Sequence, residues 1–153
     1  MKIEQGDLWQ KHQEGYHICI PVNKETKSDL TAVMGAGLAN EARLIFPELP
    51  KLLGEAIRRD SHSTGLFFRL PAYRLIMLGT KRNWRDPSDL ESIRRSCERM
   101  AAAIGKPGAN SLIDPAQYPV YLPKLGCGCG KLKWTDVAPV MQRALNDNFV
   151  VLI

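Results

Sequence analysis

The sequence predicts an α/β fold, a three-layer α/β/α sandwich with a mixed, mainly parallel sheet. Short apolar runs alternate along the chain with segments of helical periodicity. Several of these runs are continuously apolar, as in strands buried on both faces of a parallel sheet. The chain has 153 residues, of which 44% are hydrophobic and 24% charged, which suits one globular domain over residues 1–153 and excludes wholesale disorder.

Three apolar runs and two helical patterns occupy the first half of the chain. Pro21 stops the first run, so a loop is expected at Asn23. Apolar residues then recur at helical spacing from the glycines of residues 34–37 until Pro47. In chain order, we expect a strand over 16–22, a helix over 37–46, a helix over 50–59, a polar loop over 58–65, and strands over 66–70 and 73–78.

The second half of the chain contains a helix with a marked start signal. Asp86 can cap this helix, Pro87 stands at its first position, and Asp89 lies in its first turn. Its apolar face continues to Ile104, and Gly105 ends it. The remaining expected segments are a surface connection over 105–117, a strand over 118–122, a glycine-rich loop over 123–132, a helix capped by Thr135, and a strand over 149–153.

Charge, hydropathy and cysteine content restrict the classes of function. The net charge of +5 mildly favours anionic partners such as phosphates or nucleic acid. No apolar stretch can span a bilayer and the first residues lack the apolar centre of a secretory signal, so we expect a cytoplasmic protein without membrane contact. The four cysteines should be free thiols, and Cys127-x-Cys129 lacks the second ligand pair of a zinc site. We expect a monomer with neither metal nor cofactor.

Two glycine-rich segments, Met34–Gly37 and Gly126–Gly130, are each expected to follow a strand. Glycine permits positive φ and leaves no Cβ between backbone N–H donors and phosphate oxygens, so two such loops suit a diphosphate. The alternative is that each glycine only shapes a turn. Neither segment has the G-x-x-x-x-G-K-[ST] pattern of a P-loop or the third small residue of a dinucleotide fingerprint.

Taken in order, five sequence strings resemble a macrodomain over nearly the whole chain. The resemblance is strongest to the branch that contains the terminal ADP-ribose glycohydrolases and the DarG antitoxin macrodomain, which removes ADP-ribose from DNA. The T-K-R-x-W-R string, followed by Asp86-Pro-Ser-Asp, is its most specific part. The strings are Gly6-Asp7-Leu8, Val22-Asn23, Met34–Ala39, Thr80–Arg85, and Pro123–Gly128 with Leu132 and Trp134.

The resemblance implies an ADP-ribose cleft. Asp7 would accept a hydrogen bond from the adenine amino group with help from the Leu8 backbone, although Asp7 by itself is an ordinary turn aspartate. Asn23 would face the distal ribose, and the two glycine-rich loops would hold the diphosphate and that ribose. The implied ligand-binding residues are Asp7, Leu8, Asn23, Met34, Gly35, Ala36, Gly37, Leu38, Thr80, Leu125, Gly126, Cys127, Gly128, Cys129 and Gly130.

The resemblance also implies a catalytic lysine. Lys81 matches the lysine that this branch uses as a nucleophile on the anomeric carbon of the distal ribose. A lysine can attack only where desolvation or neighbouring cations, here Arg82, keep part of it neutral. Read without the family, Lys81 is a solvated basic loop residue.

One departure from the family pattern leaves the activity open. The ADP-ribosyl-glutamate hydrolases of this branch carry an aspartate shortly after G-C-G, where this chain has Cys129-Gly130-Lys131. A glycine there is similar to the DNA-directed antitoxins. Two alternatives follow, a deglycosylation that depends on lysine alone or an ADP-ribose binder without turnover. Cys129 is either a plain loop thiol or a thiol beside the site.

A basic rim with one tryptophan would suit single-stranded DNA as a partner. Trp84 can stack a base, and cations beside it can contact phosphates. The alternative is a solvated rim with Trp84 packed on the following helix. The candidate nucleic-acid residues are Arg82, Trp84, Arg85 and Lys131.

The sequence therefore predicts a hydrolase that removes ADP-ribose from a macromolecule, with DNA as the leading substrate. A reader that binds ADP-ribose without cleaving it is the alternative. An ADP-ribose 1''-phosphate phosphatase is disfavoured because neither glycine-rich loop contains a histidine.

Overall fold

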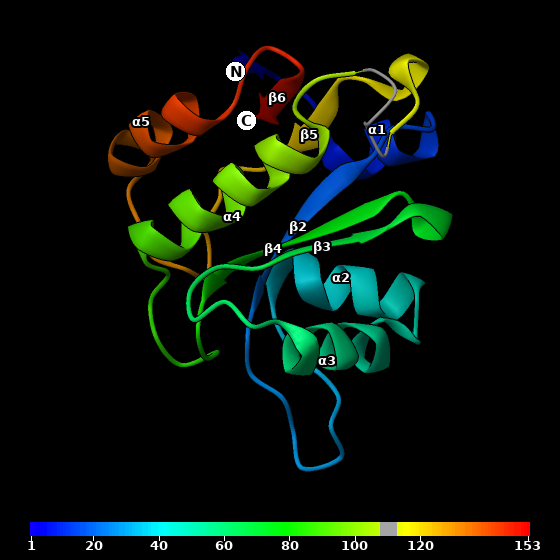
Figure 1. The fold of residues 1–153 in the computed structure, drawn as a ribbon, viewed down its shortest axis with the longest axis vertical. Coiled ribbons are helices and arrows are strands. Elements are labelled where there is room, and N and C mark those ends of the chain that lie inside the picture. The colour runs from blue at the N-terminus through cyan, green and yellow to red at the C-terminus, as the bar shows by residue number, and fades with distance from the viewer. Residues whose placement is uncertain (108–112) are drawn as a thin grey trace.

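A computed structural model describes residues 1–107 and 113–153 and contains a sheet of six strands with helices on both faces (Figure 1). The strand order is β1-β6-β5-β2-β4-β3, and every neighbouring pair is parallel except β3 with β4. The strands are β1 (Lys2–Glu4), β2 (Ile18–Asn23), β3 (Phe67–Leu70), β4 (Leu75–Lys81), β5 (Val120–Leu122) and β6 (Phe149–Leu152). The helices are α1 (Leu8–Gln13), α2 (Gly37–Ile45), α3 (Leu49–Arg59), α4 (Leu90–Ile104) and α5 (Trp134–Ala144).

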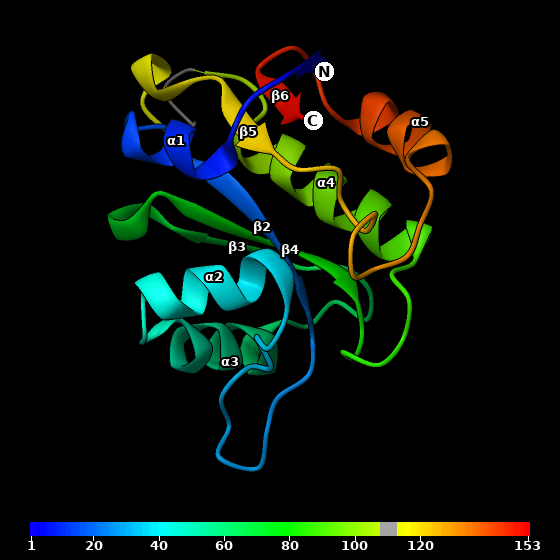
Figure 2. The same cartoon turned by 180° about the vertical axis from the view of Figure 1, so that it is seen from behind.

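Two hydrophobic cores fill the space between the sheet and its helices, so the predicted three-layer fold class is confirmed. Helices α1, α2 and α3 cover one face of the sheet, and α4 and α5 cover the other (Figures 1 and 2). Alternation along β2 shows the two-sided burial, because Ile18 and Ile20 enter the first core while Cys19 enters the second. All three side chains are fully buried.

The strands and helices that the sequence predicts are present, with ends that differ by at most three residues. The sequence analysis assigns no element to residues 1–13, yet the structure forms β1 and α1 there. Residues 108–112 of the predicted surface connection lie outside the described residues, and Pro115–Gln117 forms a 3-10 turn. Among the described residues, no helix has the length and apolarity needed to cross a bilayer.

Helix α4 begins later than its sequence signal indicates. Its N-cap is Asp89, so the prediction that Asp86 caps it was wrong. The Ser88 N–H donates to the Gly130 carbonyl at 2.9 Å, and the Asp89 N–H donates to the Thr80 carbonyl at 3.0 Å. These bonds hold Ser88 against the second glycine-rich loop and Asp89 against the end of β4. The helix therefore starts only after these two residues.

Helix α5 begins at Trp134, and the prediction that Thr135 caps it was also wrong. Lys133 is the N-cap and makes no side-chain capping bond. Its carbonyl accepts from the N–H groups of Asp136 and Val137 at 2.9 and 3.1 Å, which closes the first turn before Thr135 could act as a cap.

Candidate functional site

A cleft of about 880 Å³ lies at the carboxyl ends of the parallel strands, where ligands bind in open α/β sheets. Both glycine-rich loops line it, together with residues from the ends of β2, β4 and β6. The sequence-predicted residues that line the cleft are Asn23, Met34, Gly35, Ala36, Gly37, Leu38, Thr80, Lys81, Trp84, Gly126, Cys127, Gly128, Cys129 and Gly130.

The ends of β2 and β4 place Asn23 beside Lys81. The two residues are register partners across a shift in the ladder at Val22 and Asn23. The buried Asn23 amide donates to the Val33 carbonyl at 3.1 Å and accepts from the Glu25 N–H at 2.9 Å. Asn23 therefore fixes both ends of the loop that leads from β2 to the first glycine-rich segment.

The first glycine-rich loop delivers the N-terminus of α2 to the cleft. Gly37 has φ of +57°, a conformation that a residue with a Cβ rarely adopts. Ala36 is the N-cap and makes no side-chain capping bond, so α2 begins without an internal acceptor for the N–H groups of its first turn. Those donors and the helix dipole favour an anion at this end of the cleft.

The second glycine-rich loop faces the first across the cleft. A Cβ on Gly37 would lie 3.5 Å from Cys129 Sγ, so the two loops are in close contact.

The two cysteines of the second loop differ in exposure. Cys129 is exposed, and burial raises the pKa of the half-buried Cys127 thiol above its usual value. All four cysteines are free, and no cluster of three or more metal-ligating side chains occurs within residues 1–107 and 113–153.

Ser88 is a cleft residue that the sequence analysis missed. It is buried, its N–H donates to the Gly130 carbonyl at 2.9 Å, and its Oγ donates to Thr80 Oγ1 at 3.2 Å. Ser88 thus joins the end of β4 to the second glycine-rich loop. The sequence before α4 gave no sign of this role, because it depends on contacts with the end of β4 and with the distant Gly130 that only the folded sheet creates.

Lys81 lies at the last position of β4, at the cleft wall, rather than in a loop. Its Nζ donates to the Trp84 carbonyl at 3.3 Å. The Trp84 side chain is 52% exposed, and the Arg85 guanidinium lies 5.2 Å from the centre of its ring. The Trp84 N–H donates to Glu25 Oε2 at 3.1 Å, so the turn after β4 is held by the segment that follows the neighbouring strand β2.

Some predicted residues lie outside the cleft lining. Leu125 is fully buried in the core beneath the second loop, so its side chain cannot line the site. Asp7 caps α1 by accepting from the Gln10 N–H at 2.8 Å, and Leu8 is buried. The other predicted residues that do not line the cleft are Arg82, Arg85 and Lys131.

Asp7 nevertheless lies near one end of the cleft. A Cβ on the preceding Gly6 would be 3.3 Å from Leu152 Cδ2, and Leu152 and Ile153 line that end. Neither Leu152 nor Ile153 was predicted from the sequence as a site residue, and neither were Pro21 and Val33. Val22, Ala39, Pro123 and Lys124 lie within the strings that carry the resemblance but were not named there as ligand-binding residues. A strand-end signal could have found the wall residues at the ends of β2, β5 and β6, since the carboxyl ends of parallel strands share one edge of the sheet.

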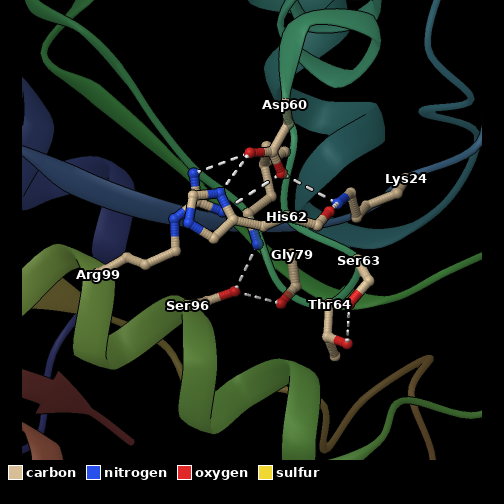
Figure 3. A network of polar contacts seen from close by, with 9 residues as sticks. Lys24, Asp60, His62, Ser63, Thr64, Gly79, Ser96 and Arg99 are labelled. Atoms are coloured by element: carbon tan, nitrogen blue, oxygen red, sulfur yellow. Dashed lines mark hydrogen bonds and ion pairs between the residues drawn. The ribbon is translucent and has the colours of Figure 1, made fainter.

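An ion-pair network around the buried Asp60 carboxylate lies next to the loop that follows Asn23 (Figure 3). Asp60 accepts from Lys24 Nζ at 3.0 Å, from both Arg99 Nη atoms at 3.0 and 3.2 Å, and contacts His62 Nδ1 at 3.0 Å. Burial by itself would raise the pKa of Asp60, but the hydrogen bonds from Arg99, Lys24 and His62 lower it to about 2. Because Lys24 follows the last residue of β2 and Arg99 lies on α4, the network connects the cleft end of β2 to α4.

Comparison with known proteins finds two relatives by sequence. No family model matches the chain. It is 28% identical over 134 residues to a DNA ADP-ribosyl transferase-DNA ADP-ribosyl glycohydrolase fusion protein of Thermosipho africanus, covering 74% of this chain and 32% of the relative. It is 28% identical over 120 residues to a DNA ADP-ribosyl glycohydrolase of Thermus aquaticus, covering 74% and 31%. The chain therefore spans about a third of the length of either relative.

Solved structures share the fold over almost the whole chain. Thermosipho africanus DarTG in complex with ADP-ribose matches with a TM-score of 0.73 at 20% identity, covering 99% of this chain and 41% of that one. The macrodomain of Thermus aquaticus DarG matches with a TM-score of 0.70 at 22% identity, covering 99% and 97%. The macrodomain of Mycobacterium tuberculosis DarG matches with a TM-score of 0.64 at 22% identity, covering 99% and 95%.

Proposed function

The protein has the macrodomain fold, and from that premise we propose that residues 1–153 form one domain that binds ADP-ribose and hydrolyses its bond to a macromolecule, with DNA as the leading substrate. The observation that carries the proposal is the position of Lys81, at a strand end in the wall of a cleft formed by two glycine-rich loops. The names of the two sequence relatives, both DNA ADP-ribosyl glycohydrolases, support DNA as the substrate.

The diphosphate would lie between the two glycine-rich loops. The uncapped N-terminus of α2 supplies N–H donors there, and Gly35 and Gly128 leave open space, since a Cβ on either would meet no atom within 4 Å. The adenine would lie toward Leu152 and Ile153, where one Asp7 oxygen caps α1 and the other can accept from the adenine amino group. The distal ribose would then lie near Asn23 and Lys81.

In the proposed reaction, the neutral Lys81 amine bonds to the anomeric carbon of the distal ribose. The bond from that carbon to the DNA atom breaks, and the leaving atom takes the bonding electron pair and the proton that the amine loses. Water then attacks the same carbon, releases ADP-ribose, and returns a proton to Lys81. The glutamate-directed hydrolases have an aspartate shortly after the G-C-G string, where this chain has Gly130 and Lys131. The proposed route therefore relies on Lys81 alone.

The DNA strand would pass over the rim beside Lys81. Trp84 is exposed at the cleft mouth and can stack a base, and Arg85 is already placed over its ring. Arg82 and Lys131 are exposed cations that can contact phosphates, which would make binding weaken with salt.

The proposal is tested by incubating the protein with ADP-ribosylated single-stranded DNA and, separately, with an ADP-ribosylated glutamate peptide, and following free ADP-ribose. We expect release from DNA that Lys81→Ala abolishes, while the affinity for ADP-ribose, measured by calorimetry, changes by less than about threefold. Lys51→Ala, an exposed lysine on α3, is the matched control and should release ADP-ribose at the wild-type rate.

A non-catalytic reader of ADP-ribose is the second candidate, and the absence of an aspartate at positions 129–131 favours it. Its signature is calorimetric binding of ADP-ribose by the wild type with no release from either substrate. Release that persists in Lys81→Ala would instead contradict the lysine mechanism while leaving a hydrolase.

A further inference from the structure

The turn that follows β4 is tied to the loop that follows β2. The Lys24 N–H donates to the Arg82 carbonyl at 3.0 Å, and the Trp84 N–H donates to Glu25 Oε2 at 3.1 Å. The carbonyl of the same Trp84 accepts from Lys81 Nζ at 3.3 Å. A chain of two hydrogen bonds therefore runs from the Glu25 carboxylate through Trp84 to the Lys81 amino group.

Glu25 itself is held in place at both backbone groups. Its N–H donates to Asn23 Oδ1 at 2.9 Å, and its carbonyl accepts from the Val33 N–H at 3.1 Å. Its side chain is half-buried, and Asn23, which holds it, is the register partner of Lys81. The backbone of Glu25 is thus held relative to the strand that carries Lys81, and its carboxylate reaches the Trp84 N–H from that position.

We propose that Glu25 is a positioning residue that acts through Trp84 to hold the Lys81 amino group in the cleft; this inference rests on the proposed function. A lysine side chain has four rotatable bonds, and a nucleophile must be held in a narrow range of positions to attack. The hydrogen bond to the Trp84 carbonyl uses one N–H of a neutral amine and leaves its lone pair for the anomeric carbon. Glu25 supplies the anchor because its side-chain oxygen accepts the Trp84 N–H and so holds the carbonyl of the same residue in place.

Glu25 does not act on the substrate directly, because its side chain is not part of the cleft lining that includes Lys81 and Trp84. Its task is to accept a hydrogen bond, which an amide oxygen can also do. Glu25→Gln should therefore preserve the turn, whereas Glu25→Ala should release it. An acid or base role would be lost in both variants, so the pair separates positioning from proton transfer.

The experiment measures kcat and KM for ADP-ribose release from ADP-ribosylated single-stranded DNA, and the hydrogen exchange of the Trp84 amide by NMR. We expect Glu25→Ala to lower kcat by about 10- to 100-fold with little change in KM, and to speed exchange at Trp84. Glu25→Gln should stay within about threefold of the wild type in kcat and keep the amide protected. Glu41→Ala is the matched control, since it removes a glutamate that accepts from Trp9 Nε1 outside the cleft.

The outcomes separate this inference from the function on which it rests. If the wild type releases no ADP-ribose, the proposed function fails and the role of Glu25 fails with it. If the wild type releases ADP-ribose no faster than Lys81→Ala does, the lysine mechanism and the role of Glu25 fail while a hydrolase remains. If Lys81→Ala abolishes release while Glu25→Ala turns over like the wild type, the inference alone is overturned. Equal losses in Glu25→Ala and Glu25→Gln, or an unchanged Trp84 amide in Glu25→Ala, also overturn it.

Discussion

Gly130 and Gly128 lie two residues apart on the same wall of the cleft but differ in the space that surrounds them. A Cβ on Gly130 would overlap Ser88 Oγ and lie 2.5 Å from the Gly126 carbonyl oxygen, whereas a Cβ on Gly128 would meet nothing within 4 Å. Glycine is thus a packing requirement at position 130 and leaves open cleft space at position 128.

This difference predicts unequal losses of stability for two alanine substitutions. Gly130→Ala should lower the free energy of unfolding by about 2 kcal/mol, because backbone and the buried Ser88 must move to admit the methyl group. Gly128→Ala should change it by less than about 0.5 kcal/mol. Urea denaturation of both variants checks the prediction, and equal stabilities would contradict the close approach at Gly130.

At the scale of elements, the start of α4 indicates that Asp89 and Asp86 contribute differently to the stability of the fold. The Asp89 carboxylate accepts from the Ser92 N–H at 2.7 Å and from Ser92 Oγ at 2.9 Å. Asp89→Ala should therefore cost about 1 kcal/mol of stability, while Asp86→Ala, outside the helix, should cost almost nothing. Thermal unfolding of the two variants measures the difference, and a larger loss for Asp86→Ala would reverse the assignment of the cap.

The same helix shows where sequence patterns stop being informative. The apolar periodicity of α4 and the glycine that ends it predict its body and its end, because those depend on local spacing. Its start depends on bonds to Gly130, which is distant in sequence, and to Thr80 at the end of the preceding strand, and a local capping signal at Asp86 could not reveal them. Residues 1–13 were missed for a related reason: β1 has no buried residue and is a strand only through its ladder with β6.

For the whole molecule, the fold class and most of the cleft could be predicted from the sequence. Both glycine-rich loops carry local signals, Lys81 is indicated by the family resemblance, and the sheet brings all three to one edge. What could not be predicted is how they are joined, since Ser88 and Glu25 act through contacts between separate strand ends. Such residues are ordinary in sequence, and only the assembled sheet distinguishes them.

The whole fold also predicts how stability depends on pH, through one buried base and one buried acid. Burial, together with the nearby Arg69, Arg74 and His12, lowers the pKa of His17 to about 4, and neither of its ring nitrogens has a hydrogen-bond partner among the described residues. Asp60 has a pKa of about 2 in its ion-pair network. The two groups titrate in separate ranges.

The unfolded chain binds a proton at His17 near pH 6.5, while the folded protein does not until about pH 4, so stability should fall as the pH decreases from 6.5 to 4. Asp60 favours the folded state above pH 3.8, and its contribution is lost as the pH falls from there toward 2. His17→Phe should flatten the decline of the free energy of unfolding between pH 6.5 and 4. Asp60→Asn should leave the slope of that decline unchanged but lower the free energy of unfolding at neutral pH by about 2 kcal/mol. Denaturant midpoints measured across this pH range check both, and an unaltered slope in His17→Phe would assign the decline to another group.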